Sequence, residues 1–371
     1  MSTAPWSEVT RFVSEVLVQA RMRREDADIL ARSLVETEAS GVTTHGLSRL
    51  APYVEQLRSG QVNPRPEERV LSETGGALLV DADGGFGAPV GVRALEAAMG
   101  KARHQGIALA AVTRVAHFGA AGFYTRLAAD QGFLALALSS SSPSVVPHGG
   151  AGPRIGNSPL SFAAPGERGP ELVLDIAQSM ASRGRIKVAR DRGETLPEGW
   201  AVDAEGRPTR DPGAALAGGV LPSGGHKGSG LSLVVEMLAS GLGGANLSQH
   251  VALSGFTAAE GAAERTGVDV TVGNLYLVID AEVFGDGTGV RQRAGRIAAH
   301  VRASEPAPGV ERVHAPGDIE AEHRRRAERA GLELSCRTRE ELRELARRMR
   351  LSTPLPAFLV PTEESGDDGG N

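Results

Sequence analysis

Five short aliphatic runs, separated by glycine-rich turns and helical stretches, occupy the middle of this 371-residue chain. They are ALLVD (77–81), IALAAVT (107–113), FLALAL (133–138), ELVLD (171–175) and NLYLVID (274–280). Runs of this length are typical of buried β-strands. Their alternation with helical segments predicts an α/β layer structure.

Both ends of the chain have the spacing of amphipathic helices. Near the N-terminus, before Gly41, apolar residues recur every three or four positions: Val9, Phe12, Val13, Val16, Leu17 and Ala20, then Ala27, Leu30, Ala31 and Leu34. Near the C-terminus, Thr338 and Glu341 fit a capping box for a helix with this apolar face: Leu342, Leu345, Ala346 and Met349. We therefore expect helices at both ends. Residues 361–371 are polar and acidic, which is typical of a disordered tail.

Composition excludes several classes of protein. The net charge of −5, a pI near 6.0 and the lack of a basic stripe argue against a nucleic-acid partner. A single cysteine, Cys336, excludes an internal disulfide and a cysteine-based zinc site and suits the cytoplasm. There is no apolar stretch of about 18 residues and no signal-peptide core, so we expect no membrane partner. Without an H-E-x-x-H motif, we predict no metal site.

Glycine is abundant, with 48 residues, but the standard phosphate-binding loops are missing. The segment GGFGAPVG (84–91) departs from the G-x-G-x-x-G spacing of the Rossmann fingerprint. Lys227 lacks the frame of a P-loop, because His226 stands where that motif requires glycine. If the chain binds a nucleotide, it does so by another route.

Lys227 is unusual because only three of the chain's 40 basic residues are lysines. It lies in LPSGGHKGSG, among glycines, and begins an apolar segment that we expect to be a buried helix. A compact ammonium retained in an arginine-rich chain favours a polar ligand that needs a point donor. The alternative, equally acceptable from the residues, is that Lys227 caps a glycine-rich turn.

A second candidate group lies in SGVTTHGLSRLAPY, where His45, Arg49 and Tyr53 follow one another at intervals of four. If this stretch is helical, the three side chains share one face. An imidazole, a guanidinium and a phenol together can clamp a carboxylate and place a proton donor beside it. The alternative is a solvated helix face with a capping histidine.

His117 follows the strand-like run 107–113 and precedes a helical segment. Active-site residues often lie at such a strand end, and a histidine there can exchange a proton near neutral pH. The start of the next helix is expected to lower the pKa of His117, because it disfavours the cation. A purely structural role as a cap of that helix is the alternative.

Hydroxyl and carboxylate groups end two other predicted strands. The run SSSSP, which contains Ser141, follows 133–138 directly, and its hydroxyls suit a ribose or a carboxamide, although serine runs are more often flexible loops. Asp175 ends the run 171–175. A carboxylate there either caps a helix or binds a sugar hydroxyl.

In order along the chain, these segments resemble the type 2 malate/L-lactate dehydrogenase family, which includes ureidoglycolate, sulfolactate and diketogulonate oxidoreductases and cyclic-imino-acid reductases. Seven segments carry the resemblance: SGVTTHGLSRLAPY, RVAHFGAAGFYTRLA, PSVVPHGGAGPRIGNSPLSFAAP, LVLDIAQSMASRGRIK, EGWAVDAEGRPTRDP, LPSGGHKGSGLSLVVEMLASGLGGA and GNLYLVID. The resemblance implies a non-Rossmann α/β domain with a mixed sheet at 76–309, which binds cofactor and substrate. It also implies a discontinuous helical domain at 1–75 and 310–360, and a homodimer.

The same resemblance assigns roles to the candidate residues. It makes His117 the general acid and base and lets His45 orient or polarise the acceptor, with Arg49 holding the substrate carboxylate and Tyr53 close by. It implies NAD or NADP as cofactor, with these contacts: Ser141, Asp175, Ile176, Ala177 and Lys227. Arg183 and Arg185 could meet a 2′-phosphate, but arginine is the default cation of this chain, so the choice between NAD and NADP stays open.

The implied reaction is hydride transfer between nicotinamide and C2 of a 2-hydroxy or 2-oxo acid. One alternative is reduction of the C=N bond of a cyclic imino acid at the same site. Another, from a different class, is a catalytically silent dinucleotide-binding protein. The substrate is uncertain because the chain departs from the family pattern. Thr43 and Thr44 replace a common Asp-Ser pair, Asn157 and Ser158 stand in a changed GNSP motif, and His148 replaces a frequent aromatic residue.

Overall fold

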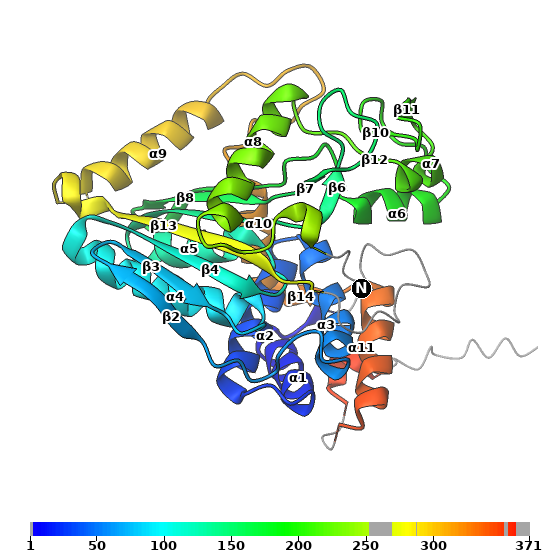
Figure 1. Cartoon of the computed structure of the whole chain (residues 1–371), viewed down its shortest axis with the longest axis horizontal. Coiled ribbons are helices and arrows are strands. Elements are labelled where there is room, and N and C mark those ends of the chain that lie inside the picture. The colour runs from blue at the N-terminus through cyan, green and yellow to red at the C-terminus, as the bar shows by residue number, and fades with distance from the viewer. Residues whose placement is uncertain (1–2, 252–268, 287, 352–354, 361–371) are drawn as a thin grey trace, which may run out of the picture.

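The computed structural model describes residues 3–251, 269–286, 288–351 and 355–360, and it shows an α/β protein with mixed sheets (Figure 1). The α/β class predicted from the sequence is therefore confirmed. The expected tail, 361–371, lies outside the described residues. The α-helices within the described ranges are α1 (Trp6–Gln19), α2 (Arg24–Ala39), α3 (Leu50–Arg58), α4 (Gly87–Gln105), α5 (Ala121–Asp130), α6 (Arg183–Asp191), α7 (Pro212–Ala217), α8 (His226–Glu236), α9 (Thr288–Arg302), α10 (Asp318–Ala330) and α11 (Cys336–Met349).

A seven-stranded sheet with the order β2-β3-β4-β13-β5-β8-β9 forms the centre of the molecule. Its strands are β2 (Arg69–Thr74), β3 (Ala77–Asp81), β4 (Ile107–Val115), β5 (Phe133–Ser139), β8 (Leu160–Gly166), β9 (Gly169–Ile176) and β13 (Val272–Asp280). Neighbours β3 and β4 are parallel, and every other neighbouring pair is antiparallel. A doubly wound Rossmann sheet is mostly parallel, so this topology explains why the fingerprint is missing.

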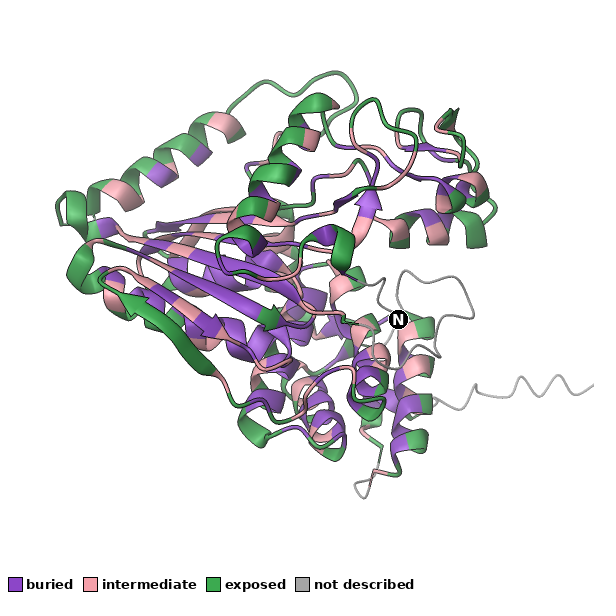
Figure 2. Cartoon of the chain, viewed as in Figure 1, coloured by how far each residue is buried: buried purple, intermediate pink, exposed green. Residues whose placement is uncertain are grey.

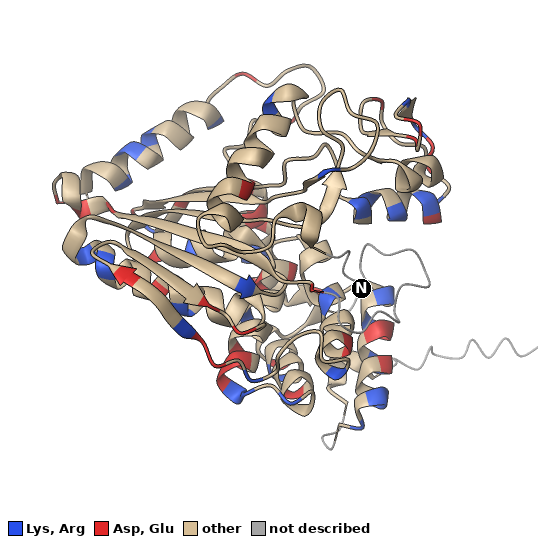
Figure 3. Cartoon of the chain, in the orientation of Figure 1, with Lys and Arg blue, Asp and Glu red and all other residues tan. Residues whose placement is uncertain are grey.

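All five predicted strands are confirmed, as β3, β4, β5, β9 and β13. Along β4 the side chains alternate between two cores, as a strand buried on both faces requires. One core lies between the sheet and the helices α4 and α5. The other lies under α8 and η3 (Met237–Gly241), a π-helical turn that continues α8. Figure 2 shows the central strands of the sheet largely buried and the edge strand β2 exposed, and Figure 3 shows the central strands largely free of charged residues.

The helices of the two chain ends pack on each other beside this sheet (Figure 1). The apolar faces predicted for α1, α2 and α11 are buried in one common core. The capping box is wrong in detail: Ser335 is the N-cap of α11, and its Oγ accepts the Thr338 N–H at 3.0 Å. The helix therefore begins before Thr338.

A second sheet, with the order β11-β10-β12-β6-β7, was not predicted. Its strands are β6 (Pro143–Val145), β7 (Ile155–Gly156), β10 (Ala201–Val202), β11 (Pro208–Thr209) and β12 (Gly219–Val220). Each has two or three residues, which is too short for an alternating pattern. This sheet has a small core of its own with α6 and α7, and its strand β6 follows directly after the serine run.

Candidate active site

A cavity of about 350 Å³ lies where α2, the C-terminal end of β4, the start of α5 and the end of β9 meet. Its wall includes His45, His117, Ser141 and the segment Asp175–Ala177. Residues from distant parts of the sequence are thus brought together around one space. Arg49 and Tyr53 are adjacent to this group, but they do not line the cavity.

His117 lies between β4 and α5, and two hydrogen bonds orient its ring. The Gly119 N–H donates to Nδ1 at 3.2 Å, and the Tyr53 hydroxyl lies 2.6 Å from the same nitrogen. A ring nitrogen that accepts a hydrogen bond from an N–H carries no proton itself, so a neutral His117 has its proton on Nε2. The Tyr53 hydroxyl is then the second donor to Nδ1. Nε2 is then available as a proton donor.

Electrostatics keep this imidazole neutral. Burial lowers the pKa of His117 well below its usual range, and the charges of Arg49 and His45 act in the same direction. A lowered pKa agrees with the sequence prediction, but the cause differs: burial dominates, and α5 begins only at Ala121. Burial, followed by the charge of Arg49, also lowers the pKa of His45 to about 3.

The stretch through His45, Arg49 and Tyr53 is not one helix, so the condition under which the three would share a helix face is not met. The stretch forms two 3₁₀ turns, η1 (Thr43–His45) and η2 (Leu47–Arg49), before α3 begins at Leu50. The bend still brings His45 to His117, with ring centroids 5.7 Å apart and planes at 22°. Arg49 turns back, and its Nε donates to the Thr44 carbonyl at 2.6 Å.

Tyr53 is buried beneath the cavity wall. Its ring packs on Phe86, with centroids 4.5 Å apart, and burial raises the pKa of Tyr53 to about 12, although the charge of Arg49 acts in the opposite direction. The hydroxyl therefore remains protonated and able to donate to His117. Thr44, one of the departures from the family pattern, lines the cavity and places its Oγ1 3.1 Å from His45 Nδ1.

Glu38 supports this bend, and the sequence did not point to it. Its Oε2 accepts the Leu47 N–H at 2.9 Å, and it packs so closely on Gly46 that a Cβ there would lie 2.2 Å from this oxygen. Burial raises the pKa of Glu38 to about 7. The glycine after His45 is therefore required by a buried carboxyl group.

The serine run ends β5 at Ser139 and connects it to β6 at Pro143. Ser140 Oγ accepts the Gly273 N–H at 3.2 Å and the Ser240 hydroxyl at 2.6 Å, so it has a structural role. Ser141 lies beside the cavity, and its buried Oγ has no hydrogen-bond partner among the residues that the structure describes. The same holds for Oδ1 of Asn157, another departure from the family pattern. Buried polar atoms rarely stay unpaired, so this pair fits a ligand with a donor and an acceptor, such as the carboxamide of nicotinamide.

Asp175 caps α5 and also lines the cavity, so the helix-cap alternative is confirmed and the contact with a sugar hydroxyl stays a prediction. Its Oδ2 accepts the Gly122 N–H at 2.7 Å, in the first turn of α5. Burial raises the pKa of Asp175 to about 6, against the opposing effect of the Gly122 hydrogen bond. Its accessible surface faces the cavity and a neighbouring groove, and Ile176 and Ala177 line both as well.

Lys227 lines this neighbouring groove, whose volume is about 540 Å³. It lies in the first turn of α8, across from Asp175–Ala177. The expectation of a buried helix behind it is wrong, because α8 and η3 leave large apolar side chains exposed: Leu233, Val234 and Met237. The groove and the cavity share one wall and together make an elongated site.

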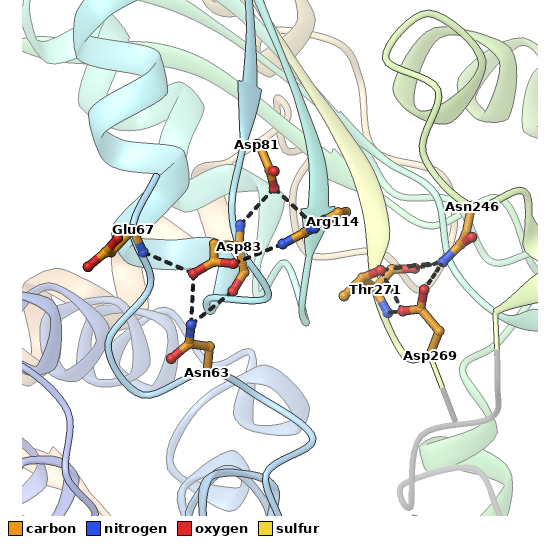
Figure 4. Close-up of polar contacts among 8 residues, drawn as sticks. All are labelled: Asn63, Glu67, Asp81, Asp83, Arg114, Asn246, Asp269 and Thr271. Carbon is orange, nitrogen blue, oxygen red and sulfur yellow. Dashed lines mark hydrogen bonds and ion pairs between the residues drawn. The ribbon is translucent and has the colours of Figure 1, made fainter. Parts of the chain in front are cut away.

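A polar cluster outside the cavity holds the strand end that carries His117 (Figure 4). Arg114, with φ +53°, donates to Asp83, with φ +48°, at 2.8 Å and lies 3.1 Å from Asp81. Asp83 also accepts from Asn63 at 2.9 Å. Strained residues of this kind persist only where surrounding contacts hold them. The cluster thus secures the 81–87 loop, whose Gly87 N–H donates to the His117 carbonyl at 3.1 Å.

The described residues contain no cluster of histidine, cysteine or acidic side chains that could hold a metal ion. Over the same ranges, no helix combines the length and the apolar character that a membrane span requires.

Comparison with known proteins gives consistent matches. The profile of the malate/L-lactate dehydrogenase family matches residues 4–343. The chain is 33% identical to an L-sulfolactate dehydrogenase of Methanocaldococcus jannaschii, over 92% of this chain and 96% of the relative. It is 34% identical to a Δ1-pyrroline-2-carboxylate/Δ1-piperideine-2-carboxylate reductase of Pseudomonas putida, over 92% and 96%. Identity to a ureidoglycolate dehydrogenase (NAD+) of Escherichia coli K12 is 33%, over 87% and 90%.

The fold comparison agrees. The structure of the Methanocaldococcus jannaschii sulfolactate dehydrogenase superposes with a TM-score of 0.85 at 31% identity, and the match covers 94% of this chain and 98% of that one. The sequence resemblance is confirmed: the chain belongs to the malate/L-lactate dehydrogenase family.

Proposed function

We propose that this protein is an NAD(P)-dependent oxidoreductase that transfers a hydride between nicotinamide and C2 of a 2-hydroxy or 2-oxo acid, with His117 as general acid and base. The observation that carries the proposal is the orientation of His117: Nδ1 is held by Gly119 and Tyr53, and Nε2 carries the exchangeable proton beside the cavity. Family membership supports the same reaction class.

The residues fit the cofactor. The unpaired Ser141 Oγ and Asn157 Oδ1 would hold the carboxamide, and Asp175–Ala177 with Lys227 would hold the rest of the dinucleotide along the groove. When bound, the nicotinamide ring supplies or accepts a hydride. Arg183 donates to the Leu216 carbonyl at 2.8 Å, and Arg185 lies 4.8 Å from the Trp200 ring, so neither favours NADP over NAD.

In reduction, Nε2 of His117 would protonate the developing alkoxide. An imidazole that loses this proton becomes an anion unless Nδ1 gains one, and the Tyr53 hydroxyl lies 2.6 Å away to provide it. Burial raises the pKa of Tyr53 to about 12 and so opposes the resulting phenolate, and the charge of Arg49 partly offsets this effect. In this proposal Arg49, which does not line the cavity, acts through its charge on Tyr53. His45, which does line the cavity, orients the acceptor. The family resemblance would instead give Arg49 the substrate carboxylate.

Reduction of a cyclic imino acid is the second candidate. The similarity to the Pseudomonas putida reductase favours it, and the same Nε2 proton would go to nitrogen instead of oxygen. A catalytically silent dinucleotide-binding protein is the third possibility. A silent binder would need the cofactor residues, but it would have no use for a neutral His117 whose Nδ1 accepts hydrogen bonds from Gly119 and Tyr53.

One experiment separates the three. Pyruvate, oxaloacetate, the oxidised form of ureidoglycolate and piperideine-2-carboxylate are each incubated with NADH and NADPH, and products are measured by mass spectrometry. Turnover of an oxo acid that falls in His117→Ala supports the main proposal, and turnover restricted to the imine supports the second. Thermal stabilisation by a dinucleotide without any turnover supports the silent binder. No stabilisation by any of NAD+, NADH, NADP+ and NADPH contradicts all three.

We also propose that the protein acts as a homodimer in the cytoplasm. Helix α8 is largely exposed (Figure 2). The large apolar side chains exposed on α8 and η3, of which Met237 is 60% exposed, offer a face for a second copy. The free thiol of Cys336 suits a reducing compartment. Light scattering after size exclusion should give twice the mass of one chain, and Met237→Glu should reduce it. A single-chain mass for the unmodified protein would contradict the dimer.

A further inference from the structure

Two arginines from distant parts of the chain meet beside the cavity. Arg126, on α5, donates to the Ser40 Oγ at 3.1 Å, and Arg324, on α10, donates to the same oxygen at 3.2 Å. The Ser40 hydroxyl itself donates to the Glu36 carbonyl at 2.7 Å, so it is fully used. One neutral hydroxyl thus holds two cations together.

The two guanidinium groups are not equally neutralised. Arg126 is buried and pairs with Glu36 at 2.9 Å, but that carboxylate also pairs with Arg32 at 2.6 Å. Within the described part of the chain, no carboxylate lies at ion-pair distance from Arg324. Burial and the charge of Arg126 lower the pKa of Arg324 to about 10, although Glu36, Glu320 and Glu328 act against this at longer range.

The position of this pair connects it with the proposed chemistry. Among the described residues that line the cavity of His45 and His117, Arg126 and Arg324 are the two permanent cations. Arg49, by contrast, donates to a backbone carbonyl behind the wall. A cation that is half-buried beside another cation is stabilised when an anion binds, and a planar guanidinium matches an oxyanion bidentately.

We propose that Arg324, supported by Arg126 and Ser40, forms an oxyanion subsite of this cavity. It takes an acidic group, a carboxylate, sulfonate or phosphate, of the bound molecule. The identity of that molecule rests on the proposed function: the group belongs either to the substrate or to the dinucleotide. Glu320 also lines the cavity.

The test uses Arg324→Gln, with Arg325→Gln as a matched control. Arg325 is the next residue on the same helix, is exposed and does not line the cavity. Folding of each variant is checked by thermal unfolding. Because burial and Arg126 disfavour the Arg324 cation, the loss of its charge should leave the melting temperature unchanged or slightly raised.

Three measurements then follow for each variant: kcat/KM for oxaloacetate, kcat/KM for pyruvate, and the Kd of NADH and NADPH. If the substrate provides the acidic group, Arg324→Gln lowers kcat/KM about 10- to 100-fold for the substrate whose acidic group it binds, with unchanged dinucleotide Kd. If kcat/KM falls for oxaloacetate alone, Arg324 binds the carboxylate that is distal to C2. If kcat/KM falls equally for both substrates, Arg324 binds the carboxylate beside C2. If the dinucleotide provides the group, its Kd rises by a similar factor.

Changes of less than about twofold in all these values, in a folded variant, would overturn the subsite. If no substrate is turned over, the proposed function fails but the subsite is still tested with malonate and inorganic sulfate as probes. Stabilisation of the unmodified protein by either anion, lost in Arg324→Gln and kept in Arg325→Gln, supports the subsite. Equal stabilisation of all three proteins, or stabilisation of none, contradicts it.

Discussion

Two walls of the site differ in how far their polar groups are satisfied: the proton-handling wall around His117, and the cofactor wall, which comprises Ser141 and Asn157 in the cavity and Lys227 in the groove. Nδ1 of His117 has two partners, and Tyr53 is packed and hydrogen-bonded beneath it. Within the described part of the chain, Ser141 Oγ and Asn157 Oδ1 have no hydrogen-bond partner, and Lys227 is exposed. The proton-handling side is complete without a ligand, whereas the cofactor side has groups that a ligand would satisfy. Changes on the first side should therefore affect turnover, and changes on the second should affect binding.

The largest effect is expected for His117→Ala. Loss of the general acid and base should reduce kcat by at least ~10²-fold, while the Kd of the dinucleotide stays the same, because the cofactor residues are untouched. Steady-state kinetics and fluorescence titration of NADH measure the two values. Near-parental turnover would remove His117 from its role, and an equal loss of dinucleotide affinity would break the distinction between the two walls.

Tyr53→Phe should have an intermediate effect. The ring and its packing on Phe86 are retained, but Nδ1 of His117 loses its stronger donor, so kcat should fall about tenfold with little change in melting temperature. As for His117→Ala, kcat should fall while the Kd of the dinucleotide stays the same, because Tyr53 belongs to the proton-handling wall. An unchanged kcat would show that Gly119 alone orients the imidazole and that Tyr53 provides no proton.

Much of this arrangement could be predicted from local sequence. The strands β3, β4, β5, β9 and β13 have aliphatic runs long enough to recognise, and the position of His117 follows from the end of β4. Other elements have no such signal. Every residue of β2 is exposed, and β8 contains Pro165 and Gly166, which disfavour strands.

The missed site residues depend on contacts between distant segments. Arg324 and Ser40 are 284 positions apart, and Arg126 and Ser40 are 86 apart. In a chain where 37 of 40 basic residues are arginine (40 minus 3 lysines), no composition argument could single these two out. The bend at Gly46 was missed for a similar reason, because the buried carboxyl that imposes it belongs to Glu38 on the preceding helix. The domain limits at 75/76 and 309/310 stay a prediction.

Lys227→Arg tests the cofactor wall with a smaller expected effect. The charge is kept but its shape changes, so the Kd of the dinucleotide should rise roughly three- to tenfold, with kcat at saturating cofactor almost unchanged. Lys101→Arg is the matched control, because Lys101 pairs with Glu73 on the surface, away from the groove. If both variants bind the dinucleotide as the parent does, Lys227 returns to the role of a turn residue.

The smallest effect is expected from the pH dependence of Asp175, and it should act in opposite directions on binding and stability. The pKa of Asp175 is raised from 3.8 to about 6, so its carboxylate is lost as pH falls from 7 to 5. Dinucleotide affinity should then weaken about threefold, because a neutral carboxyl is a poorer acceptor. The folded chain binds this proton more tightly than the unfolded chain. The free energy of unfolding should therefore rise as pH falls from 6 to 4. Asp175→Asn keeps an oxygen for the Gly122 N–H and should remove both pH effects. If affinity instead stays constant over this pH range, relative to that variant, while stability still rises as pH falls, Asp175 caps α5 but does not contact the dinucleotide.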